Sequence, residues 1–208
     1  MTAIEDRPLR ADAARNVDRI VRAARDVYRE LGPDAPIEAI ARRAGVGERT
    51  LYRRFPTKAD LVRATLESIA VGLAPTIEDA RRAADPLDGI ARLLEAAISL
   101  ASREHNLLTA AHQAGSLSMD VSAELDDALA ELARRGQEAG LVRTDLVADD
   151  LPRLIAMLHS VLWTMEPGSD GWRRYLTLVL DAISTRPSQP LPPAPPFRYD
   201  TESSGWPL

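Results

Sequence analysis

The chain has 208 residues, enough for one large domain or for a small head on a larger body, and 45% hydrophobic residues allow a sizeable core. It has no cysteine, which excludes disulfide bonds, thiolate metal sites and a thiol nucleophile. The N-terminus has no apolar run after basic residues, and no stretch reaches the ~18 apolar residues of a membrane helix, so we expect a soluble, cytoplasmic protein.

The net charge of −5 is unevenly distributed along the chain. Residues 1–62 hold 13 basic and 10 acidic residues, a net charge of +3, whereas residues 63–208 hold 13 and 21, a net charge of −8. The segment 36–63 alone has 7 basic and 3 acidic residues. A basic head on an acidic body can hold DNA at one end and repel it elsewhere.

The N-terminal part predicts a flexible arm followed by a helical head. Residues 1–14 lack periodicity, and we expect them to form the arm. Apolar residues three and four apart and the breakers Gly32-Pro33 and Pro56 delimit the helices. The expected helices cover about residues 15–31, 36–44 and 48–55, and a fourth opens at Lys58.

The remainder predicts a helical body, because apolar residues again recur at helical spacing and no strand pattern occurs. Its helices are expected over about residues 87–104, 106–115, 119–139, 150–165 and 171–185. The proline-rich segment 187–208 is expected to be a disordered or extended tail. The fold class is therefore all-α, with about nine helices: an arm (1–14), a head (15–62), a body (63–186) and a tail (187–208).

The segment Pro36 to Lys58 has the pattern of a helix-turn-helix, two short helices joined by a glycine-containing turn. Leu51 and Phe55 form the inner face of its second helix, which leaves charged side chains outside. An exposed arginine-rich helix suits phosphate and base contacts. The alternative is an ordinary helical hairpin with a solvated charged face.

The run IARRAGVGERTLYRRFPTKADLV resembles the N-terminal signature of the TetR family of transcription regulators. The positions that match are Ile40, Ala41, Ala44, Gly45, Val46, Thr50, Leu51, Tyr52, Phe55, Lys58 and Leu61. The resemblance implies a homodimer that binds a DNA operator and, through its body, an unknown small-molecule effector.

By the same resemblance, Thr50, Tyr52 and Lys58 match positions that contact the DNA backbone. Glu48, Arg49 and Arg53 occupy the exposed positions from which base contacts are made. Glu48 is unusual because it places an acid on the DNA face. It either selects cytosine or pairs with a nearby arginine, and the ion pair is the favoured interpretation.

The predicted helix 150–165 is apolar on more than one side, which indicates burial on both sides. The resemblance implies that the last two helices form a dimer interface and that the operator is palindromic; the alternative is burial inside one subunit. The expected interface residues are Leu151, Leu154, Ile155, Leu158, Leu162, Trp172, Tyr175, Leu176, Val179 and Ile183.

A ligand pocket is expected in the body, with apolar walls and a few polar groups. The candidate lining residues are Leu94, Ile98, His112, Met119, Leu125, Met157, His159 and Trp163. For each of them the alternative is a plain core position. The three histidines are not at close helical spacing, so neither a metal site nor a cofactor is expected.

These features predict a sequence-specific DNA-binding regulator, a repressor that a small molecule releases from its operator. The alternatives are a regulator without a working ligand switch, whose Pro-rich tail could dock a protein partner, and an activator. An enzyme is not expected, because the sequence has no Gly-rich phosphate loop, no HExxH and no GxSxG.

Overall fold

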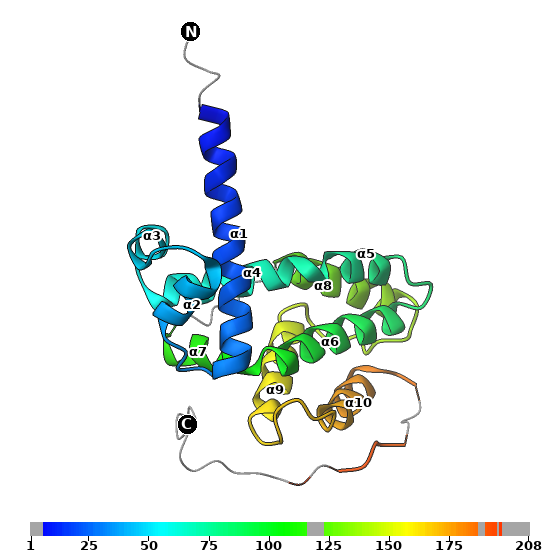
Figure 1. Cartoon of the computed structure of the whole chain (residues 1–208). Coiled ribbons are helices and arrows are strands. Elements are labelled where there is room, and N and C mark those ends of the chain that lie inside the picture. Colours follow the sequence, from blue (N-terminus) through cyan, green and yellow to red (C-terminus); the bar gives the residue numbers. More distant parts are fainter. Residues whose placement is uncertain (1–5, 116–122, 187–189, 195, 197–208) are drawn as a thin grey trace. The chain divides into compact units, whose positions relative to one another are not determined.

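The computed structural model describes residues 6–115, 123–186, 190–194 and 196, and this part of the chain is helical (Figure 1). It folds as two compact units: the described residues up to 71 with residues 104–115, and residues 72–103 with the described residues from 123 onward. The helices are α1 (Asp6–Leu31), α2 (Ile37–Ala44), α3 (Glu48–Arg54), α4 (Lys58–Ala70), α5 (Ala74–Arg81), α6 (Pro86–Arg103), α7 (His105–Gln113), α8 (Ala123–Glu138), α9 (Asp150–Leu162) and α10 (Trp172–Ile183), with a 3₁₀ turn at Val71–Leu73.

The first unit is built around α1, which packs against α2, α4 and α7. Its core collects the apolar stripes of these helices, because each stripe repeats every three or four residues and so faces one side. The largest fully buried side chains there are Ile20, Tyr28, Ile40, Leu51, Leu61 and Leu107. This unit is larger than the segment 15–62 that the helix-turn-helix pattern defines, because α7 joins it.

The expected flexible arm is wrong for residues 6–14, which form the first turns of α1. Pro8 lies in the first turn, where a missing N–H costs nothing. No further helix breaker follows until Gly32, which adopts φ 87° and whose N–H bonds the Tyr28 carbonyl at 3.0 Å. Residues 1–5 lie outside the described part of the chain.

The second unit packs α5, α6 and α8 together, and α6 also contacts α9 and α10. Two glycines allow close approach. A Cβ at Gly89 would lie 2.9 Å from the Ala80 carbonyl, and a Cβ at Gly136 would lie 2.5 Å from Val142 Cγ2. A backbone bridge links Val142 to Ser184, so the end of α10 is tied to the segment after α8.

The all-α fold is confirmed, and every helix expected from periodicity is present. The first helix starts nine residues earlier than expected, and the ends of the others shift by at most four residues. The helix α5 was not predicted, because Pro75 indicates a break in the sequence pattern. In the structure Pro75 lies in the first turn of α5, where proline is tolerated. Residues 119–122 of one expected helix and the loop at 116–118 lie outside the described residues. Of the tail, residues 190–194 and 196 are described and have no regular structure, and Arg174 Nη1 donates to the Pro192 carbonyl at 2.5 Å. Among the described helices, none is long and apolar enough to span a bilayer.

Candidate nucleic-acid interface

The turn between α2 and α3 is set by Gly45, which ends α2 in the left-handed conformation with φ 64°. A residue with a side chain rarely adopts this backbone. The Val46 N–H then bonds the Ala41 carbonyl at 3.0 Å, which closes the end of α2. Gly47 has extended backbone and is the N-cap of α3, with no side-chain cap. The turn therefore redirects the chain within three residues.

The far end of α3 is also sharply defined. Phe55 is buried, has extended backbone and bonds the Leu51 carbonyl at 2.8 Å, as suits a residue that precedes a proline. Thr57 then caps α4 in a reciprocal capping box, since Asp60 N–H donates to Thr57 Oγ1 and Thr57 N–H donates to Asp60 Oδ2, both at 3.1 Å. The seven residues of α3 are thus held between two fixed ends.

The outer face of α3 carries most of the DNA-contact residues expected from the sequence, and α3 lies at the outer edge of the first unit (Figure 1). Leu51 is fully buried and anchors the inner face. The side chains exposed on the outer face are Glu48, Arg49, Tyr52, Arg53 and Arg54, and Thr50 is half-buried.

The charged side chains of α3 have no partner in the part of the chain that the structure describes. Within the described residues, no ion pair or side-chain hydrogen bond involves Glu48, Arg49, Arg53 or Arg54. The favoured interpretation, that Glu48 pairs with a nearby arginine, is therefore wrong for this structure. The guanidinium groups are free to meet an anion or a base edge.

Neighbouring charges of the first unit are, by contrast, engaged with each other. Arg43 on α2 forms a two-pronged ion pair with Glu30 of α1, at 3.0 and 2.5 Å, and the hydrogen bond from Arg43 lowers the pKa of Glu30. The pairing keeps Arg43 on the side of α1. Arg43 therefore stabilises the first unit, whereas the arginines of α3 have no ion-pair partner among the described residues.

Lys58, expected to contact the DNA backbone, is half-buried at the start of α4. Its ammonium donates to the Pro33 carbonyl at 3.2 Å and lies 5.7 Å from the centre of the Tyr28 ring. Burial raises the pKa of Tyr28 to about 12. Lys58 thus ties α4 to the end of α1, and one of its three N–H groups is taken by the Pro33 carbonyl.

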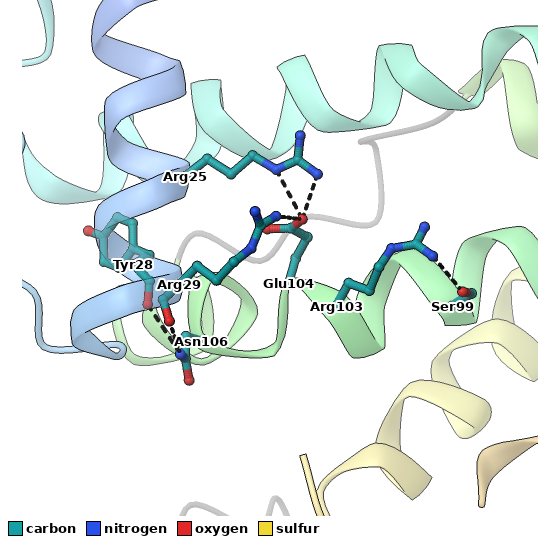
Figure 2. Close-up of polar contacts among 7 residues, drawn as sticks. All are labelled: Arg25, Tyr28, Arg29, Ser99, Arg103, Glu104 and Asn106. Carbon is teal, nitrogen blue, oxygen red and sulfur yellow. Dashed lines mark hydrogen bonds and ion pairs between the residues drawn. The ribbon is translucent and has the colours of Figure 1, made fainter. Parts of the chain in front are cut away.

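A buried carboxylate joins α7 to α1, and sequence reasoning did not find it (Figure 2). Glu104 Oε1 accepts hydrogen bonds from Arg25 at 3.0 and 2.7 Å and from Arg29 at 2.7 Å. The Asn106 side chain donates to the Tyr28 and Arg29 carbonyls at the end of α1, at 3.1 and 3.4 Å. The cluster stabilises the helix on which the helix-turn-helix is mounted.

The residues expected at a dimer interface divide into two groups. Those buried within the protomer itself, the alternative noted from the sequence, are Leu151, Ile155, Leu158, Leu162, Trp172, Leu176 and Ile183. Leu154, Tyr175 and Val179 are partly exposed. Met157 of α9 and Leu178 of α10 are large apolar side chains that are exposed, and so is Trp163 just after α9. The predicted interface does not include Met157 or Leu178.

The residues expected to line a pocket differ in their burial. Leu94, Ile98 and Leu125 are buried core residues of the second unit, whereas Met157 is exposed and His112 is an exposed residue of α7. Met119 lies outside the described residues. In the described residues, no three histidine or acidic side chains form a group that could hold a metal ion.

His159 is the member of the pocket set with unsatisfied polar chemistry. Its Nε2 atom is buried and has no hydrogen-bond partner within the described residues. Burial lowers the pKa of His159 to about 4, so the ring is neutral near pH 7.

A helix-turn-helix that presents free arginines on its second helix defines a DNA-binding protein. The family model "Bacterial regulatory proteins, tetR family" matches residues 20–65, and the model "Transcriptional regulator SbtR-like, C-terminal domain" matches residues 90–184. The chain belongs to the TetR family of transcription regulators, which are DNA-binding proteins and not enzymes.

Solved structures agree with this assignment. A TetR regulator of Streptomyces coelicolor is 28% identical, with 81% of this chain and 98% of that chain covered and a TM-score of 0.52. One from Mycobacterium vanbaalenii is 28% identical, with 86% and 100% covered and a TM-score of 0.55. The regulator PfmR of Thermus thermophilus is 23% identical, with 77% and 96% covered and a TM-score of 0.60, and shows the fold alone. No curated protein matches the chain.

Proposed function

We propose that the protein is a homodimeric, cytoplasmic repressor that binds a palindromic operator through α3 and leaves it when a small molecule binds the body. The observation that carries the DNA-binding part is that the arginines on the exposed face of α3 form no ion pair with any described residue. Unpaired guanidinium groups need not break an ion pair before they bind phosphate or guanine.

We assign the contacts by chemistry. Arg49 and Arg53, with Glu48, face base edges, because long charged side chains on an exposed helix reach into a major groove. The hydroxyl groups of Thr50 and Tyr52 donate hydrogen bonds to phosphate oxygens, and Lys58 adds a charge at the start of α4. Phosphate contacts set the register, and base contacts set the sequence preference.

A gel shift on the DNA upstream of the protein's own gene tests this role of α3, with wild type, Tyr52→Phe and Tyr52→Ala compared. Tyr52 is 43% exposed, so neither change disturbs the core. Loss of one phosphate hydrogen bond predicts a complex several-fold weaker for Tyr52→Phe. Equal binding by all three proteins would show that the Tyr52 hydroxyl does not contact DNA.

The apolar side chains that the last two helices leave exposed support a dimer. Met157, Trp163 and Leu178 are 61%, 38% and 43% exposed, although they are large apolar side chains on or beside neighbouring helices. Large apolar side chains left exposed on two neighbouring helices are typical of a protein interface. We infer that a second copy of the chain covers them, so that two α3 helices meet the two half-sites of a palindrome.

Sedimentation equilibrium tests the dimer with Met157→Glu and Leu178→Glu. A charge placed in an apolar interface opposes association, so both variants are expected to shift toward monomer. Val147→Glu is the matched control, because Val147 is 58% exposed but lies outside α9 and α10. Dissociation by the control alone would place the interface elsewhere.

The effector site is proposed in the second unit at His159. The support is its buried Nε2, which has no hydrogen-bond partner among the described residues, on a helix that packs against α6 of that unit. A neutral imidazole in an apolar setting can orient a small organic molecule by one hydrogen bond. By linkage, a ligand that prefers the DNA-free conformation weakens DNA binding.

Titration of the operator complex with a panel of small apolar and amphipathic molecules tests release. A molecule that lowers operator affinity in wild type, but less in His159→Leu, supports the switch and its site. Binding of panel molecules to the protein is detected by thermal shift. If molecules bind and leave operator affinity unchanged, the result favours the alternative, a regulator without a working ligand switch. Transcription from the operator in vitro separates repression from activation.

A further inference from the structure

We propose that Glu48 sets the base preference of the protein, and that its carboxylate accepts a hydrogen bond from the N4 amino group of a cytosine in each half-site. The inference rests on the proposed function, because it requires that α3 enters the major groove. It adds the chemistry that α3 recognises: a C·G pair at the position that Glu48 faces.

The first observation is that Glu48 has no partner within the described part of the chain. The reason lies in the spacing, because side chains on a helix meet three or four positions apart. Glu48 is the first residue of α3, so only the positions after it have this spacing, and they are Leu51 and Tyr52. Neither is basic, and Arg43 at the end of α2 is already paired with Glu30.

The second observation is the position of Glu48 as the first residue of α3, where it is exposed. Side chains lean toward the start of their helix, so this carboxylate leads α3 into a groove. The preceding residue is Gly47, which has no side chain to shield it. The other acid of the helix-turn-helix, Glu38, lies on α2.

A carboxylate at a DNA surface weakens binding unless it accepts a hydrogen bond from a donor on the DNA. The phosphates repel it, and it must give up part of its hydration. In the major groove, guanine offers only acceptors, and thymine offers an acceptor and a methyl group. Adenine has a donor at N6 beside an acceptor at N7, which repels a carboxylate. Cytosine offers the N4 donor without an adjoining acceptor, so it is the base that fits Glu48.

The neighbouring arginines complete the match. Arg49 and Arg53 are exposed and have no ion-pair partner among residues 6–115 and 123–186, and guanine N7 and O6 are the acceptors that a guanidinium binds best. A C·G pair presents a donor on one base and two acceptors on the other. An acid and free arginines on one short helix therefore favour a half-site that contains C·G pairs.

Selection from a randomised duplex library tests the inference with the full-length protein. Wild type, Glu48→Gln and the matched control Glu38→Gln are compared, because both variants lose one exposed acid from the helix-turn-helix. Wild type is expected to select cytosine at one position of each half-site, with roughly ten-fold or more loss of affinity when that base is changed. Glu38→Gln is expected to select the same operator as wild type.

Glu48→Gln is expected to lose the cytosine preference at that position. Since glutamine binds the N6 and N7 of adenine, the preference there moves to adenine or disappears, while the rest of the operator is unchanged. Identical operators for wild type and Glu48→Gln would overturn the inference, and so would a wild-type adenine at the position that Glu48 controls. A wild type that selects no sequence would instead overturn the proposed DNA-reading function itself.

Discussion

At the scale of single residues, the turn of the helix-turn-helix depends on the backbone of one glycine. Gly45 has φ 64°, whereas Gly47 has φ −72°, and a Cβ would meet nothing within 4 Å at either position. Gly45→Ala is expected to lower the free energy of unfolding by about 1–2 kcal/mol, because only its φ is unfavourable for a side chain. Gly47→Ser adds a capping hydroxyl and is expected to be neutral or stabilising. Urea unfolding measures both, and equal losses would contradict this account.

His159 predicts a pH dependence of stability at the same scale. Burial lowers its pKa from 6.5 to about 4, so between these pH values the unfolded chain binds a proton that the folded protein does not. The contribution to stability is complete above pH 6.5 and is lost as the pH falls toward 4. Urea unfolding at pH 7 and pH 5 should show a loss of about 1–2 kcal/mol in wild type that is missing in His159→Leu. The same loss in both proteins would assign it to other groups.

At the scale of secondary-structure elements, Glu104 joins α7 to α1. The Glu104 side chain is 3% exposed, whereas those of Arg25 and Arg29 are 39% and 50% exposed. The double variant Arg25→Ala/Arg29→Ala leaves the buried Glu104 carboxylate without a partner. It is expected to lower the free energy of unfolding by about 3 kcal/mol or more. Glu104→Gln leaves arginines that water can reach, and its expected cost is smaller, about 1–2 kcal/mol.

Thermal unfolding compares these variants. Arg22→Ala is the control, because Arg22 is exposed on the same helix and its guanidinium bonds the Asp18 carbonyl of that helix at 3.2 Å. A double variant as stable as Arg22→Ala would show that the Glu104 cluster does not stabilise the unit.

The packing of α8 depends on the absence of a side chain at Gly136. A Cβ there would lie 2.5 Å from Cγ2 of Val142, which is fully buried. Gly136→Ala is therefore expected to cost about 1–3 kcal/mol by overpacking. Val142→Ala removes the clashing methyl groups, so the double variant should be about as stable as Val142→Ala alone. Additive losses in urea unfolding would contradict a direct contact.

Elements with clear start and stop signals could be predicted from the sequence. Gly32, Gly45 and Pro56 end helices where glycine and proline are expected to end them. Proline gave a wrong prediction at Pro8 and Pro75, where no helix was expected. Both prolines lie in the first turn of a helix, a position that is compatible with proline.

At the scale of the whole molecule, apolar periodicity indicates that a side chain is buried. It does not indicate whether the side chain packs within its own protomer or against a partner. Leu151 and Leu158 share the apolar pattern of an interface, yet they are buried within the protomer. Met157 on the same helix is exposed and is available to a partner. The Glu104 cluster could not be predicted for a related reason, since its partners on α1 lie 75 and 79 residues away in the chain. The outer face of α3 was predictable, because seven contiguous residues between fixed ends place it.

The most direct test of the account is the affinity of the full-length protein for its selected operator, measured by fluorescence anisotropy with wild type and the double variant Arg49→Ala/Arg53→Ala. Arg82→Ala/Arg134→Ala removes the same charge from exposed, ion-paired residues of the second unit and is the control. The account predicts that the α3 variant loses roughly 100-fold or more of its affinity for the operator and little for a scrambled duplex, because base contacts are lost. The control should bind like wild type. An α3 variant that binds the operator as tightly as the control would contradict the assignment of α3 as the DNA-reading helix.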